Sequence, residues 1–175
     1  AMFTAIADAS TKPLILYNVP SRTGVNIEPA TYAALADHPN IAAIKEAGGN
    51  ISKIVETAAL VGDKLDIYSG NDDQIVPILS LGGAGVISVL SNPAPKATSE
   101  MCKKFFDGDV AASRELQLKY LELINNLFIE VNPIPVKTAC GMMGLCSDLM
   151  RLPLCEMDDA NKAKLAASMA KAGLI

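Results

Sequence analysis

Short apolar runs alternate with longer mixed stretches through the first part of the chain. Four runs have strand length and are closely followed by residues that favour turns or loops; they span residues 13–18, 40–46, 65–69 and 84–90. The stretches between them carry helix signals at residues 29–37, from Asn50 or Ser52 onward, at 72–81 and at 95–106. This alternation predicts parallel strands joined by right-handed helical crossovers, as an open sheet or as an arc of a barrel.

Beyond residue 106 the pattern predicts helices only. One spans residues 109–128, a further segment opens at Asn132, and a last helix begins at Asp158 or Asp159 and ends at Gly173. A short helix over residues 2–9 precedes the first strand. We therefore expect an α/β part at residues 1–106 and a helical extension at 107–175 that packs on it and does not fold alone.

Composition and charge exclude several classes of protein. The chain has 175 residues, of which 50% are apolar and 19% charged, and its net charge is −4. No basic face for nucleic acid is expected from this balance. No apolar run approaches the length of a membrane span, and no secretory signal opens the chain, so we predict a cytoplasmic protein without a membrane partner. One histidine, no paired cysteine spacing and no phosphate-loop pattern predict neither a metal nor a cofactor.

Lys45 ends the second apolar run. Side chains alternate along a strand, so Ile41, Ala43 and Lys45 are expected on one face and Ala42 and Ile44 on the other. Both faces of a parallel sheet are usually covered, and burial favours the neutral amine, which is a nucleophile towards carbonyls. The alternative is a lysine that ends a strand and extends into solvent.

Several candidate polar groups follow the predicted strands. In parallel α/β folds, the carboxyl ends of the strands form the edge where sites are built. The residues that fall at this edge are Tyr17, Arg22, Lys45, Gly70, Asn71, Ile87 and Ser88.

Five motifs in a fixed order connect this edge to a known family. They are Tyr17-Asn-Val-Pro-Ser-Arg-Thr-Gly24, Ile44-Lys-Glu-Ala47, Ser69-Gly-Asn-Asp72, Gly85-Val-Ile-Ser-Val89 and Asn132-Pro-Ile-Pro-Val-Lys137. Together they resemble the dihydrodipicolinate synthase family, over nearly the whole chain.

The resemblance implies a role for each candidate residue. Lys45 would form a Schiff base with pyruvate, and Tyr17 would shuttle protons to and from the reacting atoms. The enamine would add to L-aspartate 4-semialdehyde and lead to 4-hydroxy-tetrahydrodipicolinate in the lysine and diaminopimelate pathway. Without the motif, Tyr17 is equally well a core aromatic residue. The resemblance also implies substrate-binding roles for Arg22, Gly70, Asn71 and Ile87.

The family fold is an eight-stranded (β/α) barrel of about 250 residues followed by a helical extension. By resemblance this chain corresponds to the C-terminal half: four parallel βα units similar to strands five to eight, and the extension. A half-barrel of a TIM-type fold leaves strand edges unpaired. We therefore expect a homo-oligomer or a complementing N-terminal half.

Three functions remain open at this stage. The first is the pyruvate-dependent lyase described above. The second is a sibling such as N-acetylneuraminate lyase or another 2-keto-acid aldolase, which shares the lysine and the tyrosine. The third is a truncated, non-catalytic half-barrel that self-associates.

Overall fold

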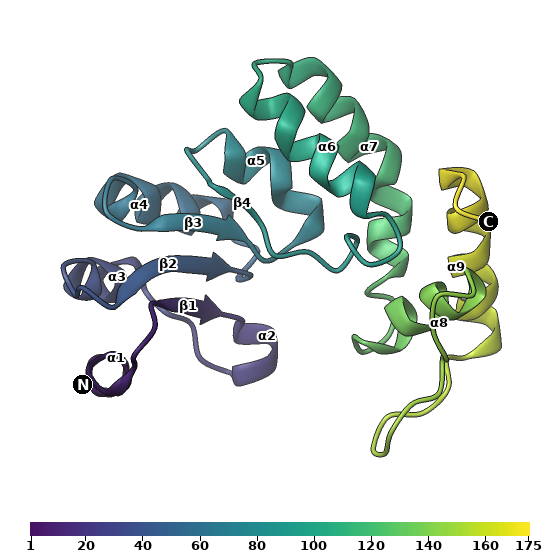
Figure 1. Ribbon diagram of the computed structural model, residues 1–175, viewed down its shortest axis with the longest axis horizontal. Coiled ribbons are helices and arrows are strands. Elements are labelled where there is room, and N and C mark those ends of the chain that lie inside the picture. The colour runs from purple at the N-terminus through teal and green to yellow at the C-terminus, as the bar shows by residue number, and fades with distance from the viewer. The chain divides into compact units, whose positions relative to one another are not determined.

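The computed structural model describes all 175 residues and contains one parallel sheet (Figure 1). Its strands lie in the order β1-β2-β3-β4, with the bounds β1 (Leu14–Asn18), β2 (Ile41–Glu46), β3 (Asp66–Ser69) and β4 (Gly85–Val86). The predicted α/β class with a parallel sheet is confirmed. β4 is shorter than the predicted run over residues 84–90, although a backbone bond from Ile87 N to Ser69 O continues its pairing.

Short helices connect the strands. They are α1 (Met2–Ala9), α2 (Pro20–Thr23), α3 (Pro29–Leu35), α4 (Ile51–Val61), η1 (Asp72–Gln74) and α5 (Ile75–Leu79). α2 was not predicted from the sequence. Proline opens both α2 and α3, because its fixed φ suits the first helical position. Asn50 caps α4 by accepting a hydrogen bond from Lys53 N at 3.2 Å, as predicted.

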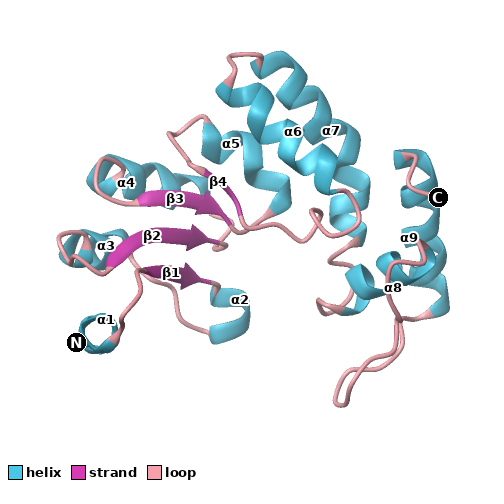
Figure 2. Cartoon of the chain, in the orientation of Figure 1, coloured by secondary structure: helices cyan, strands magenta, loops and turns pink.

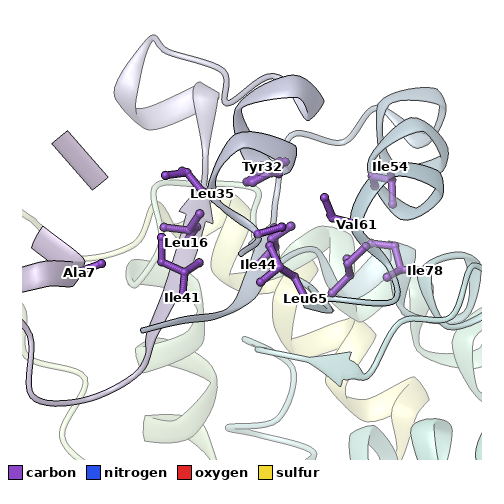
Figure 3. Packing of buried hydrophobic residues seen from close by; sticks show 12 residues of the cluster. Ala7, Leu16, Tyr32, Leu35, Ile41, Ile44, Ile54, Val61, Leu65 and Ile78 are labelled. Atoms are coloured by element: carbon purple, nitrogen blue, oxygen red, sulfur yellow. The ribbon is translucent and has the colours of Figure 1, made fainter. Parts of the chain in front are cut away.

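The hydrophobic core of this part lies between the sheet and its helices (Figure 3). Ile41 belongs to this core with Leu16 and Ile44, so the predicted placement of Ile41 on the Lys45 face is wrong. The reason is a register shift: Leu14 pairs with Ile41 but Ile15 pairs with Ala43. An extra residue in one strand interrupts the alternation of side chains at that point.

The chain forms two compact units, residues 1–87 and 88–175. The second contains no strand (Figure 2); its helices are α6 (Pro95–Phe106), α7 (Val110–Asn126), α8 (Ile134–Met142) and α9 (Asp159–Ala172). The predicted division fell after residue 106. The second unit begins earlier because it includes α6, which packs against α7. The buried Ser113 hydroxyl of α7 donates to Met101 O of α6 at 2.7 Å and joins the two helices. No helix in the chain is long and apolar enough to cross a membrane.

Candidate active site

Tyr17 and Lys45 are direct neighbours on β1 and β2. Their Cα atoms are partners in the parallel register, one residue before each strand ends. The Lys45 Nζ atom lies 4.1 Å from the centroid of the Tyr17 ring, within the range of a cation–π contact. The carboxyl edge of the sheet therefore joins an amine, which can attack a carbonyl, to a phenol, which can donate and accept a proton.

The sheet face that carries this pair is open within the first unit. Tyr17 is 45% exposed, Ile15 on the same strand is 50% exposed and Lys45 is half-buried. The expectation that both sheet faces are covered is thus met on the helix-facing side only. The Lys45 amine makes no hydrogen bond or ion pair, and its aromatic contact leaves it accessible for reaction.

Gly70 follows β3 and lies against the Lys45 side chain. A Cβ atom at Gly70 would stand 3.2 Å from Lys45 Cε and 2.7 Å from the Ala47 Cβ. The Gly70 N–H donates to Glu46 O at 2.7 Å, so this backbone bond holds the two strand ends together. The absence of a side chain lets the Lys45 stem pass close to the backbone. Asn71 comes next and is the N-cap residue of η1.

The structure does not bring the other two predicted residues into a contact with Lys45. Arg22 lies in α2, where its exposed side chain makes no hydrogen bond or ion pair. Ile87 is 38% exposed and follows β4. Both follow strands of the sheet, as predicted, and the arrowheads in Figure 1 show that the strand ends meet at one edge.

A buried polar network on the opposite face was missed by the sequence reasoning. Asn18 and Glu46 are the residues that follow Tyr17 and Lys45, and they too are register partners. Asn18 Nδ2 donates to Glu46 Oε1 at 2.9 Å and Oε2 at 3.1 Å. The Glu46 carboxylate also accepts from Gly48 N at 2.6 Å and from the Tyr32 hydroxyl at 3.3 Å.

Burial sets the electrostatics of this network. Glu46 is 6% exposed and Tyr32 is fully buried. Burial raises the pKa of the Glu46 carboxyl, and the hydrogen bonds from Gly48, Asn18 and Tyr32 act in the opposite direction. Burial, with the neighbouring Glu46 carboxylate, also raises the pKa of Tyr32, which remains a neutral donor.

A pocket of about 230 Å³ lies beside the network, and its lining includes Asn26, Glu46, Asn50 and Lys53. No group of three or more His, Cys, Asp or Glu side chains is placed to hold a metal ion. The network had a signal in the sequence, because Asn18 and Glu46 occupy strand positions on the core side, where an unpaired polar group would be costly. The sequence analysis also did not single out Tyr68, which is the β3 register partner of Lys45.

Comparisons with known proteins agree on one family. The model of the family described as dihydrodipicolinate synthetase matches residues 1–172. The chain is 58% identical over 175 residues to the 4-hydroxy-tetrahydrodipicolinate synthase of Clostridium perfringens, and the match covers 100% of this chain and 60% of that protein. It is 54% identical over 173 residues to the enzyme of the same name from Geobacter sulfurreducens, with 99% and 60% covered. The crystal structure of dihydrodipicolinate synthase from Thermotoga maritima superposes with a TM-score of 0.96 at 40% identity, covering 99% of this chain and 60% of that one.

The chain therefore spans about 60% of the length of these relatives. The matches cover this chain from end to end and do not bear out the prediction that it is the C-terminal half of a family member.

Proposed function

Because the chain belongs to the dihydrodipicolinate synthetase family, we propose that Lys45 forms an imine with pyruvate as the first step of a lyase reaction. The derived enamine adds to L-aspartate 4-semialdehyde, and cyclisation gives 4-hydroxy-tetrahydrodipicolinate for lysine and diaminopimelate biosynthesis. The observation that carries this proposal is the contact of the Lys45 amine with the Tyr17 ring, 4.1 Å from its centroid, at the carboxyl edge of a parallel sheet. Imine chemistry needs such an amine with a proton donor and acceptor beside it.

The first step replaces the C=O bond of pyruvate with a C=N bond and releases the oxygen as water. The Lys45 nitrogen attacks the keto carbon of pyruvate, and the carbonyl oxygen gains a proton to give a carbinolamine. Loss of the hydroxyl as water leaves the C=N bond. In this scheme Tyr17 gives a proton to the departing oxygen and takes one from the nitrogen.

The remaining predicted residues have binding roles in the proposal. Gly70 and Asn71 line the approach to Lys45, which is supported by the 3.2 Å that would separate a Gly70 Cβ from Lys45 Cε. Arg22 binds the carboxylate of the semialdehyde, a task that suits its planar guanidinium. Ile87 provides an apolar contact for pyruvate; it is 38% exposed and available for one.

The sheet itself is proposed to be an arc of a (β/α) barrel at residues 1–106, with the helices from residue 107 onward as its extension. The exposure of Ile15 and Tyr17, at 50% and 45%, supports this proposal. Large apolar side chains in a barrel interior are normally covered, so the face that carries these two residues lacks its opposite wall. A second copy of the chain, or a polypeptide with further βα units, would supply the opposite wall.

Reductive trapping tests the proposal directly. The purified chain is incubated with pyruvate and borohydride, which reduces the imine to a stable carboxyethyl group on the lysine nitrogen. We expect peptide mass spectrometry to find this group at Lys45. Lys45→Arg should abolish that label, whereas the matched control Lys64→Arg, a surface lysine that pairs with Asp37 at 2.8 Å, should leave it unchanged. Equal labelling of Lys45 and Lys64 in the unmodified chain contradicts the proposal.

A second assay separates the alternatives. Pyruvate and L-aspartate 4-semialdehyde are supplied together, and product is followed with a coupled reductase. Product formation supports the synthase. A labelled Lys45 without product indicates the non-catalytic half-barrel, and release of pyruvate from N-acetylneuraminate indicates the sibling lyase.

A further inference from the structure

The ends of β1 and β2 carry two pairs of residues on opposite faces. Tyr17 and Lys45 form the pair on the open face, and Asn18 and Glu46 form the pair on the helix-facing side. Consecutive residues of a strand share one backbone, so the position of each pair depends on the other. Asn18 and Glu46 are 3% and 6% exposed, and both are fully engaged in hydrogen bonds.

The network of Asn18 and Glu46 also reaches the loop that contains Arg22. Asn18 Oδ1 accepts from Ile27 N at 3.0 Å, and Asn18 Nδ2 donates to Asn26 Oδ1 at 2.9 Å. These bonds tie the far end of the loop, which leaves β1 through α2, back to the strand it came from. On the other side, the Glu46 backbone oxygen accepts from Gly70 N at 2.7 Å. One residue therefore contacts the strand end of Tyr17, directly follows Lys45 and bonds to Gly70.

We propose that Glu46 is a positioning residue: its buried carboxylate fixes the ends of β1 and β2 so that the Lys45 amine on the opposite face stays against the Tyr17 ring. Its importance for catalysis rests on the proposed function of Lys45, but the geometric claim does not. The Glu46 side chain makes its hydrogen bonds to Asn18, Gly48 and Tyr32 and not to Lys45 or Tyr17, so it acts on that pair through the backbone.

The donors around position 46 suit a carboxylate. All three neighbouring groups donate to Glu46: the Asn18 amide, the Gly48 N–H and the Tyr32 hydroxyl. A Cβ atom at Gly48 would stand 2.7 Å from Glu46 Oε1, so only glycine lets that N–H approach the carboxylate. A glutamine at position 46 would set its NH₂ group against the NH₂ group of Asn18, and one donor would lose its acceptor.

A nuclear magnetic resonance experiment measures the geometry without any substrate. Lysines of the full chain are dimethylated with isotope-labelled formaldehyde and a mild reductant, and the Lys45 methyl signal is assigned by its loss in Lys45→Arg. Because Lys45 Nζ lies over the Tyr17 ring, its methyl signal should be displaced upfield of the other lysines. We expect Glu46→Gln to reduce that displacement by at least about half, as a strand end released from its buried partner becomes mobile.

Matched variants distinguish positioning from general stability. Glu56→Gln makes the same chemical change on the exposed side of α4 and should leave the Lys45 signal in place. The double variant Asn18→Asp with Glu46→Gln exchanges acceptor and donor between the two strands and should restore part of the displacement, because Asn26 Oδ1 still loses its donor. All spectra are recorded well below the unfolding transition of each variant. A folded Glu46→Gln protein with the full upfield displacement overturns the proposal. A dimethylated protein of the original sequence without any displacement of the Lys45 signal overturns it as well.

If Glu46→Gln does not fold, Tyr32→Phe decides the question. It removes one donor to the carboxylate and keeps the buried ring, and a partial loss of the displacement is expected; an unchanged displacement overturns the proposal. Pyruvate trapping then gives an independent measure. The maximal labelling rate of Glu46→Gln should fall about 10-fold, with little change in the pyruvate concentration for half-maximal rate, because the carboxylate does not contact substrate. Failure of the unmodified chain to label at Lys45 would reject the proposed function and leave the spectroscopic result standing.

Discussion

The two faces of the sheet carry polar groups in different conditions. On the helix-facing side, Glu46 is 6% exposed and accepts hydrogen bonds from Asn18, Gly48 and Tyr32. On the open side, Lys45 makes an aromatic contact with Tyr17, which is 45% exposed. A buried polar group without partners costs free energy, so the closed face is saturated with hydrogen bonds. The open face can leave an amine unpaired, and such an amine is available to react.

The largest difference between the faces is expected in how much an apolar residue on each face contributes to the free energy of unfolding. Ile44 is fully buried and Ile15 is 50% exposed on the neighbouring strand. Ile44→Ala should lower the free energy of unfolding by about 3 to 4 kcal/mol, because it leaves a cavity in the core. Ile15→Ala should cost less than about 1 kcal/mol. Denaturant unfolding of both variants measures the comparison; an equal cost at Ile15 would mean that another chain covers the open face in solution.

The second largest effect is expected for a substitution at Gly70, which contacts both Lys45 and the backbone of Glu46. A Cβ atom there would stand 2.7 Å from the Ala47 Cβ and 3.0 Å from Glu46 O. Gly70→Ala must therefore shift the end of β2, at a cost of about 1 to 3 kcal/mol in the free energy of unfolding. The shift also moves Lys45, and the rate of pyruvate trapping should fall about 10-fold.

Gly82→Ala is the control for this prediction. A Cβ atom added at Gly82 has no atom within 4 Å, so it causes no steric contact, although Gly82 adopts a φ of +88°. It should therefore lose stability through backbone strain without a change in Lys45 trapping per folded molecule. Equal trapping by Gly70→Ala and the unmodified chain would show that Gly70 does not set the position of Lys45.

Much of the candidate site follows from the sequence because it depends on short-range patterns. Apolar runs with turn residues after them located β1 to β3, and parallel strands bring their carboxyl ends to one edge. The pairing of Tyr17 with Lys45 then needs only strands of matching register. Residue type and position also narrowed each of two helix caps to a pair of residues, and the structure has Asn50 and Asp158 in those places.

The features that were missed depend on contacts distant in the sequence. Ile41 lies on the unexpected face because the register between β1 and β2 shifts near Leu14, and alternation within one strand cannot reveal a bulge. In α4 the apolar spacing of Ile51, Ile54, Val55 and Ala58 predicts one buried face, but Val55 is 45% exposed. The buried residues instead include Thr57, whose hydroxyl donates to Lys53 O at 2.9 Å. A satisfied hydroxyl can replace an apolar side chain in the core, which changes the buried face of the helix.

The smallest expected effect concerns the pH dependence of stability on the closed face. Burial raises the pKa of Glu46 in the folded chain above its ordinary value of 4.5. The folded state therefore binds this proton more tightly than the unfolded state, and the stabilisation is fully present below about pH 4.5 and lost as the pH rises through the raised pKa. Glu46→Gln cannot titrate, so the free energy of unfolding of the unmodified chain should fall relative to this variant over that window.

Denaturant unfolding of both proteins at a series of pH values measures this difference. Titration of groups outside the network, such as Asp73, whose pKa is also raised by burial, is common to both proteins and cancels. Lys53 of α4 lines the same pocket as Glu46 and stays charged across the window, so it does not alter the sign. A relative stability that rises with pH would mean that the hydrogen bonds from Asn18, Gly48 and Tyr32 outweigh burial and that Glu46 is held as a carboxylate even in acid. Either sign thus tells which of two opposing forces controls the residue behind Lys45.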